Sequence, residues 1–391
     1  MSKKKTLPSR SGFQKQLPLF LLYLCSIIIF VGAYYLVKPA PKDTIAAEEY
    51  AEYETGTVTM ILSDSTERDT YSDNSWRGEQ LLIVEITSGQ YKGQSMQVSN
   101  YVGPLYSVPL KVGDSAVLII STYKDGTHLG TVYEYNRFIP ILIVIGLFVL
   151  ATVIVGGKTG AKSLLGLLLT LATLFYILIP ALMKGAPTLF TTFLVCAYIT
   201  IVSLAILGGL SKKTVCAMLG TISGTGLAMI FGIISQTLLR INGMRIPDAE
   251  ALLQLQQTGV PIHINGLLVA GVIISALGAV MDVAMSISSA LTEVHAANPS
   301  LTCKNLIRSG MNIGRDMVGT MTNTLILALL GSSTVLIIYL YSLSLSSNQF
   351  LSSSYLAIEV VSSISSSIGV ILAVPVTVLI SSFALTYQKK N

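Results

Sequence analysis

Carboxylates within apolar segments are the residues of this sequence that most need a chemical explanation. Asp282 lies inside an apolar segment, and a polar turn separates it from Asp316, which follows Arg315 at the start of the next apolar segment. A charged group in hydrocarbon is costly and usually faces a bundle interior or a water-filled path. Two carboxylates with neighbouring hydroxyl and amide oxygens could coordinate a hard cation or relay protons. The stretch 271–324 is therefore the first candidate for a functional site.

The residues around Asp282 predict one polar face of a helix, because they are spaced three or four apart, as residues on one side of a helix are. Small residues on such a face let another helix approach closely, and hydroxyls hydrogen-bond across the contact, so the simplest interpretation is a packing seam. That interpretation does not by itself explain a carboxylate. The face comprises Gly271, Ser275, Gly278, Asp282, Ser286, Ser289 and Glu293.

A second polar face is predicted on the following helix, where Asp316, Thr320 and Asn323 are spaced four and three apart. We expect both aspartates toward the cytoplasmic side, because the two helices meet at a common turn. The neutral oxygens of Ser286, Thr320 and Asn323 would complete a cation or proton site around the carboxylates.

Arg315 leaves two alternatives open. It either forms a structural ion pair with Asp282 or Glu293, or it tunes a proton or ion site electrostatically. Glu359 begins a further polar face on the last helix and is expected nearer the outer surface than the aspartates. The candidate ion-site or transport residues are Asp282, Ser286, Glu293, Arg315, Asp316, Thr320, Asn323 and Glu359.

The elements that must position these residues are membrane helices. Of the 391 residues, 52% are hydrophobic and only 12% are charged, and several apolar runs reach the length that spans a bilayer. An N-terminal anchor and seven later runs predict about eight transmembrane helices. The seven runs are Phe138–Val155, Leu164–Met183, Leu189–Leu207, Val215–Leu239, Gly266–Leu291, Met317–Tyr341 and Tyr355–Leu385.

The segment 37–137 is different in composition, since it carries 14 of the 20 acidic residues and the single tryptophan. Its first part, 43–56, is predicted to be an acidic linker. After it, alternating and β-branched runs separated by glycine-containing turns predict a small antiparallel barrel of about five strands.

Basic residues in the short loops set the orientation. One side carries 14 of them, and the other side's short loops carry Lys184, Arg240 and Arg245. By the positive-inside rule both termini are cytoplasmic and the β-rich segment is extracytoplasmic. A short amphipathic helix is expected between Asp248 and Gly259. The predicted parts are a basic tail 1–16, a transmembrane anchor 17–36, an extracytoplasmic β-rich domain 37–137 and a seven-helix transmembrane domain 138–391.

Three motifs carry a family resemblance. They are SALGAVMDVAMSISSALTEV from Ser275, SGMNIGRDMVGTMTNTLILA from Ser309 and SSIGVILAVPVT from Ser366. They resemble the hallmark segments of the YibE/F-like family of bacterial membrane proteins, and the resemblance covers the chain from about Phe138 onward. The anchor and β-rich segment resemble the longer, E-type members. The resemblance implies a multi-pass protein of the bacterial cytoplasmic membrane, often encoded beside a shorter relative, and it implies no settled activity.

Transport is the function that the sequence favours: a cation- or proton-coupled membrane transport protein with an unknown substrate. The alternative is a non-transporting envelope assembly or signalling protein that pairs with a shorter family relative. We do not expect an enzyme or a cofactor, because Gly314-Arg315-Asp316 does not match the G-x-G-D motif of intramembrane aspartyl proteases and no other catalytic spacing occurs. The expected partners are the lipid bilayer, a shorter paralogue or a homo-oligomer, and a small ion or molecule, but no nucleic acid.

Overall fold

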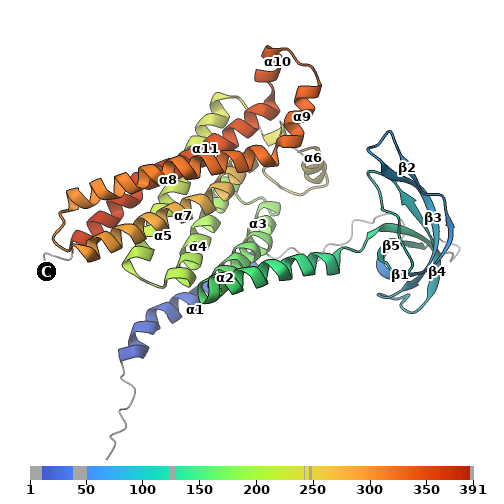
Figure 1. Cartoon of the computed structure of the whole chain (residues 1–391), viewed down its shortest axis with the longest axis horizontal. Helices are drawn as coiled ribbons and strands as arrows, with labels where there is room; N and C mark the ends of the chain where they lie inside the picture. Colours follow the sequence, from blue (N-terminus) through green and yellow to red (C-terminus); the bar gives the residue numbers. More distant parts are fainter. Residues whose placement is uncertain (1–10, 38–50, 123–127, 242, 246–248, 388–391) are drawn as a thin grey trace, which may run out of the picture. The chain divides into compact units, whose positions relative to one another are not determined.

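The computed structural model describes residues 11–37, 51–122, 128–241, 243–245 and 249–387 (Figure 1). The chain divides into two compact units. One unit is Ala40–Thr152, and the other combines Met1–Pro39 with Val153–Asn391. The first contains all the β-strands, and the second contains most of the helices, so the composition change in the sequence corresponds to a structural division.

The strands form a barrel. Five of them close a ring in the order β1-β5-β6-β4-β3, since β3 pairs back with β1, and the short strand β2 pairs with β3 outside the ring. Alternate residues of β3, namely Leu82, Val84 and Ile86, fill the interior, as the period of two requires. The strands are β1 Ala51–Asp64, β2 Glu67–Asp69, β3 Ser75–Ile86, β4 Ser95–Val102, β5 Ser115–Thr122 and β6 His128–Tyr135.

The five-strand barrel predicted from the sequence is confirmed, with two corrections. The ring is not wholly antiparallel, because β4 and β6 pair in parallel at Val98 and Gly130. The acidic segment predicted to be a linker is partly strand, because β1 begins at Ala51 and Glu54 pairs with Leu118 of β5. The part of that segment before Ala51 lies outside the described residues.

A buried polar network holds the β4–β5 connection against the barrel. The Gln80 side chain is 1% exposed; its Oε1 accepts from the Leu110 backbone N–H at 2.8 Å and from Asn100 Nδ2 at 2.9 Å. Its Nε2 donates to Asp64 Oδ2 at 2.8 Å and to the Leu110 carbonyl at 3.2 Å. These bonds satisfy groups that would otherwise be buried without partners.

The junction between β6 and the following helix α2, Phe138–Thr173, contains only two residues. The Asn136 backbone N–H donates to the Ser115 carbonyl at 2.9 Å, and its side-chain oxygen accepts from the Phe138 N–H at 3.1 Å. Arg137 pairs with Glu134 at 3.2 Å. The first turns of α2 therefore continue directly from the barrel, within the same compact unit.

The described residues hold five helices long and apolar enough to cross a membrane, or six if the bent pair α8–α9 is one span. This agrees with a multi-pass membrane protein; the predicted number of eight is not confirmed. The remaining helices are α1 Ser11–Val37, α3 Ile179–Met183, α4 Thr188–Gly208, α5 Lys212–Leu238, α6 Ala249–Gln257, α7 Leu267–Ala297, α8 Cys303–Ser332, α9 Thr334–Ser342, α10 Ser347–Leu351 and α11 Ser354–Thr386.

Two predicted boundaries are wrong. The first predicted run ends close to its predicted boundary, since two helices meet across a kink at Gly157 (φ 54°, ψ −134°), but the second begins directly after this kink rather than at Leu164. A glycine takes this conformation because it has no Cβ. The helix expected at Met317 begins already at Cys303, since its first turns are amphipathic rather than apolar, and it bends by 59° where α9 follows it. The predicted amphipathic helix is confirmed as α6.

The core of the helical unit lies between α5, α7, α8 and α11, which run beside one another (Figure 1). Glycines allow α5 and α11 to approach closely: a Cβ on Gly224 would lie 2.7 Å from the Ala373 Cβ, and one on Gly369 would lie 2.7 Å from the Ala228 Cβ. Small residues four apart on both helices are typical of membrane helix contacts.

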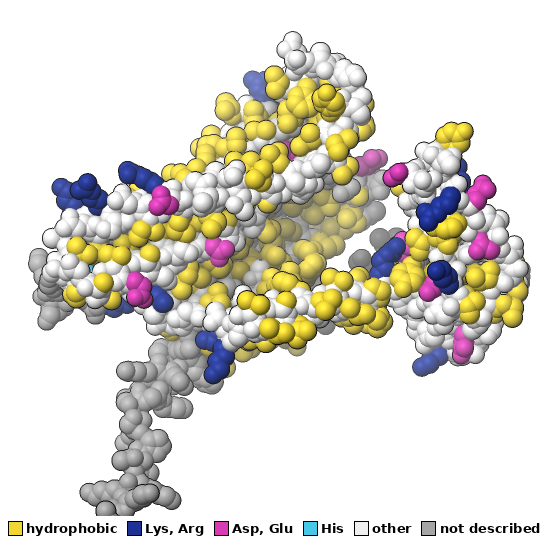
Figure 2. All heavy atoms as spheres, in the orientation of Figure 1, with side chains coloured by type: hydrophobic (Ala, Val, Ile, Leu, Met, Phe, Trp, Pro, Cys, Tyr) yellow, Lys and Arg dark blue, Asp and Glu magenta, His cyan; other side chains and the backbone are white. Residues whose placement is uncertain are grey.

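Hydrogen bonds show which helix ends lie together. Thr188 donates to the His263 carbonyl at 3.0 Å, which joins the start of α4 to the start of α7. Ser288, near the other end of α7, donates to the Lys213 carbonyl at 2.7 Å. Basic side chains gather at the end of the bundle where α8 begins, as Figure 2 shows.

Candidate functional site: a polar helix face and a carboxylate cavity

The predicted polar face of α7 exists, and it points away from the core. We call its seven residues the α7 stripe: Gly271, Ser275, Gly278, Asp282, Ser286, Ser289 and Glu293. Five of them are exposed and the two serines Ser275 and Ser289 are half-buried. The opposite face of α7, with Val280 and Ile287, is fully buried against the core.

The stripe is open over much of its length. A Cβ built on Gly271 or Gly278 would have no atom within 4 Å, apart from its own helix and chain neighbours. The packing seam expected from the sequence is therefore not filled at these glycines by other described residues of the helical unit. Ser275 is an exception, because its hydroxyl hydrogen-bonds to Ser366 of α11 at 2.9 Å.

The predicted face of α8 is exposed as well. Arg315, Asp316, Thr320 and Asn323 all lie on the surface of the helical unit. The Thr320 hydroxyl donates within its own helix, to the Met317 and Asp316 carbonyls at 3.2 and 3.3 Å. The face of α8 that packs on the bundle is instead formed by Leu306, Gly310 and Gly314.

Within the described residues the structure does not bring the predicted side chains together by a bond. Both ion pairs between described residues are in the barrel unit, and Arg315 pairs with neither Asp282 nor Glu293. Hydrogen bonds also do not join Asp282 to Asp316 in the part of the chain that is described. Nor do three His, Cys, Asp or Glu side chains there lie close enough to share a metal ion.

Glu359 lies in a cavity that sequence analysis missed. The cavity has a volume of about 660 Å³ and opens where α7, α8, α9 and α11 meet. Glu359 is the one charged residue among those that line it. Its other polar lining is entirely hydroxyl: Ser275, Ser332, Ser333, Tyr339, Tyr355 and Ser362. Carboxylate and hydroxyl oxygens are ligands that suit a hard cation or an amine.

The α7 stripe and this cavity are continuous, because Gly271 and Ser275 belong to both. From Gly271 to Glu293 the helix advances by roughly 33 Å at about 1.5 Å per residue, which is about the thickness of the hydrocarbon core. Asp282 lies midway along this distance. One helix face therefore carries polar groups from the Glu359 cavity across the thickness of a membrane.

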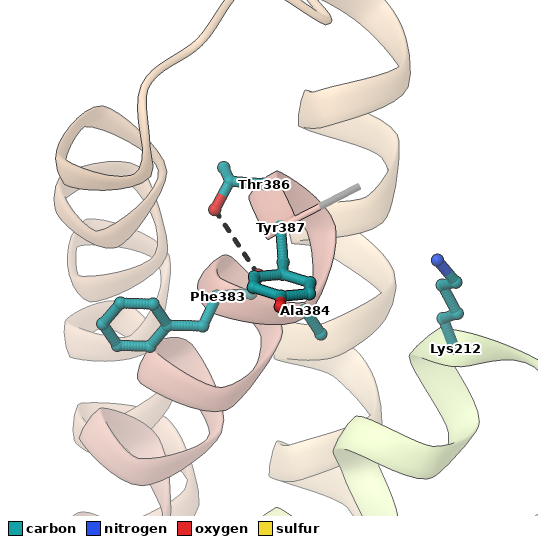
Figure 3. Close-up of a pocket in the computed structure, with 5 residues that line it drawn as sticks. All are labelled: Lys212, Phe383, Ala384, Thr386 and Tyr387. Atoms are coloured by element: carbon teal, nitrogen blue, oxygen red, sulfur yellow. Dashed lines mark hydrogen bonds between the residues drawn. The ribbon is translucent and has the colours of Figure 1, made fainter. Parts of the chain in front are cut away.

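A second hollow lies at the other end of the bundle. Its volume is about 410 Å³, and it is lined by Lys212, Phe383, Ala384, Thr386 and Tyr387 (Figure 3). Figure 3 shows Lys212 on one side and the rings of Phe383 and Tyr387 on the other. None of the residues predicted from the sequence lines it, and we assign it no part in the site.

Comparison with known proteins gives one match. The family model described as YibE/F-like protein matches residues 144–387, more than half of the chain, and this range contains the α7 stripe, the α8 face and the Glu359 cavity. None of the curated proteins and none of the solved structures matches the chain.

Proposed function

We propose, from the premise that this chain belongs to the YibE/F-like family, that it is a membrane transport protein whose movement of substrate is coupled to a cation or to protons. The observation that carries the proposal is the polar path along α7, which begins in the Glu359 cavity and passes Asp282. Polar and ionisable groups are rare in membrane segments and typically mark pathways of ions or protons.

Each residue has a role in this proposal. Glu359 and the surrounding hydroxyls receive the cation at one end. Asp282 carries a proton or the cation at mid-depth, with Ser286 as a neutral oxygen one turn further. On α8, Asp316 acts at about the same membrane depth as Asp282, and Thr320 and Asn323 supply neutral oxygens beside it. Arg315 favours the ionised state of the carboxylates near it.

The orientation remains as the basic residues predict, with the barrel outside the cytoplasmic membrane and both termini inside. Two observations support it. Lys184 donates to the Leu36 carbonyl at 3.0 Å, so the end of α1 that leads into the barrel lies beside the α3–α4 turn. Lys213 and the α7 end near Ser288 lie together, at the basic end.

A total of eight spans also belongs to the proposal. The helical run Phe138–Met183 contains 46 residues, roughly 69 Å at about 1.5 Å per residue, which is twice the hydrocarbon thickness and suits two spans meeting at Gly157. With α1 and the bent pair α8–α9 each counted as one span, the total is eight.

Flux through proteoliposomes tests the function. The purified chain is reconstituted, and proton flux and Na⁺, K⁺ and Mg²⁺ flux are measured with indicator dyes under an imposed gradient. We expect Asp282→Asn and Asp316→Asn to lower the active flux at least tenfold. Glu250→Gln on α6, which changes an acid outside the stripe, is the matched control and should leave flux unchanged.

Equal flux in the wild type and in both aspartate variants would show that these carboxylates do not carry transport. Flux no greater than in empty liposomes for every ion would favour the envelope assembly function, for which the uncovered α7 stripe offers a partner surface.

A further inference from the structure

We propose that a second copy of this chain covers the α7 stripe, with its α8 facing this α7, so that Arg315 and Arg308 of each copy lie against Asp282 and Glu293 of the other. The ion site of the proposed function would then be complete only in the pair. The inference deepens that function, but the pairing itself depends only on the observations below.

The first observation is an exposed carboxylate in the middle of a membrane helix. Asp282 lies on the outward face of α7, with open space around Gly278 one turn before it. Lipid cannot solvate a carboxylate, so such a group normally faces protein or water. A helix of a partner chain can approach this face closely because its side chains are small.

The second observation is a set of unpaired opposite charges on two helices that contact each other, α7 and α8. Asp282 and Glu293 are the acids of the α7 stripe, and Arg308 and Arg315 are exposed bases of α8. In the described residues none of these four has an ion-pair partner. Within the described part of one chain, therefore, these two acids and two bases are opposite in charge but do not satisfy each other, and Asp316 beside Arg315 is exposed as well.

The charges also match in depth. Glu293 lies four residues before the end of α7 and Arg308 five residues after the start of α8, which is roughly 6 and 8 Å from the common turn. Asp282 and Arg315 are fifteen and twelve residues from the same helix ends, roughly 22 and 18 Å. An arginine side chain spans the difference.

Two-fold symmetry makes the arrangement self-consistent. Two copies with the same orientation in the membrane are related by an axis along the membrane normal, which keeps every residue at its depth. In such an isologous contact, α7 of one copy meets α8 of the other and the reverse contact occurs as well. The four acidic groups and the four basic groups then meet in four pairs.

Disulfide cross-linking in membranes tests the contact. Each of Cys25, Cys196, Cys216 and Cys303 is replaced by serine, and two differently tagged chains are co-expressed. One carries Ser286→Cys, and the other carries Asn312→Cys, an exposed α8 position at similar depth. We expect at least tenfold more mixed dimer on oxidation than with the control pair, Leu219→Cys on the exposed surface of α5 with Asn312→Cys.

A charge exchange between chains provides the second measurement. Asp282→Arg and Arg315→Asp should each abolish self-association of the chain that carries it, because equal charges then face one another. Co-expression of the two variants should restore a mixed dimer. In one of its two contacts the unchanged Asp282 and Arg315 meet, and in the other the two substituted side chains meet, again with opposite charges. Restoration also demonstrates that both variants are folded.

Each outcome is decisive. The proposal is overturned if Ser286→Cys cross-links no more than the control pair and co-expression of the charge-exchange variants does not restore a mixed dimer. It is also overturned if Ser286→Cys forms its disulfide with a different protein or with a cysteine placed in α2 of the same chain. A confirmed pair whose flux is no greater than that of empty liposomes would leave the pairing standing and remove the transport function. Asp282-dependent flux from a chain that does not pair would support the transport function and overturn the pairing.

Discussion

At the scale of single residues, Gln80 is the side chain on which the barrel most depends. It is 1% exposed and makes four hydrogen bonds, two of them with the backbone of Leu110. Gln80→Ala leaves the buried Leu110 N–H without its partner and removes one of the two bonds that Asn100 Nδ2 donates, so we expect the barrel to lose about 2 kcal/mol of stability. Hydrogen exchange of the barrel amides in the whole protein measures this loss.

Gln97→Ala is the matched control, because Gln97 is exposed on the neighbouring strand β4. Its effect should stay within about 0.5 kcal/mol. Equal protection of the amides in the two variants would contradict the role assigned to the network. Hydrogen bonds from the Thr66 hydroxyl and backbone N–H, and to a smaller extent the bond from Gln80, lower the pKa of the Asp64 carboxyl.

The α7 stripe illustrates what residue spacing can and cannot predict. Intervals of three and four residues establish that Gly271, Asp282 and Glu293 share a helix face, and the structure confirms this. The same intervals are compatible with a face turned inward or outward. The outward orientation follows from the opposite, apolar face of α7, which packs on the neighbouring helices α4, α5, α8 and α11.

The Glu359 cavity could be predicted only in part. Glu359 was identified because a carboxylate in an apolar segment is unusual. Its partners Ser332, Tyr339 and Tyr355 come from three separate elements and have no shared spacing. They meet because α8 bends before α9, and a bend of this kind has no signature in hydrophobic periodicity.

At the scale of elements, the contact between α5 and α11 requires glycine. A Cβ on Gly224 would lie 2.7 Å from both Ala373 and Val280, a distance that real Cβ atoms do not show. We expect Gly224→Ala to force the helices apart and to destabilise the bundle by about 1–3 kcal/mol. The midpoint of thermal unfolding in detergent measures the effect.

The control for this substitution lies on the same helix. A Cβ on Gly226 would meet Phe193 at 3.4 Å, an ordinary contact distance, so Gly226→Ala should leave the midpoint unchanged or raise it slightly. If both alanine variants unfolded at the temperature of the wild type, the close approach of α5 and α11 would not limit stability.

Elements were predictable where the pattern is local. Alternation of apolar residues predicted the strands, and the length of apolar runs predicted most of the membrane helices. The parallel pairing of β4 with β6 was missed because it depends on closure of the ring, which no local pattern encodes. The segment from Gly156 to Ser163 was predicted as a basic turn, yet here only Gly157 leaves helical geometry and the next helix follows directly.

At the scale of the whole molecule, the proposed orientation can be tested by labelling. In a background without native cysteines, Tyr71→Cys in the barrel should react with a membrane-impermeant maleimide in intact cells, because Tyr71 is 98% exposed. Lys162→Cys should react only after the membrane is permeabilised, since it lies with the basic loops. The opposite pattern of labelling would invert the orientation.

The two-residue junction after β6 gives the barrel a mechanical connection to the membrane. Asn136 bonds to both β5 and α2, and the barrel with the start of α2 forms one compact unit. A molecule that binds and twists the barrel would therefore turn the start of α2 with it, because no free loop absorbs the load. Further along the same helix, at Gly157, the helical backbone geometry is interrupted. The first turns of α2, which belong to the same compact unit as the barrel, are therefore expected to move together with it.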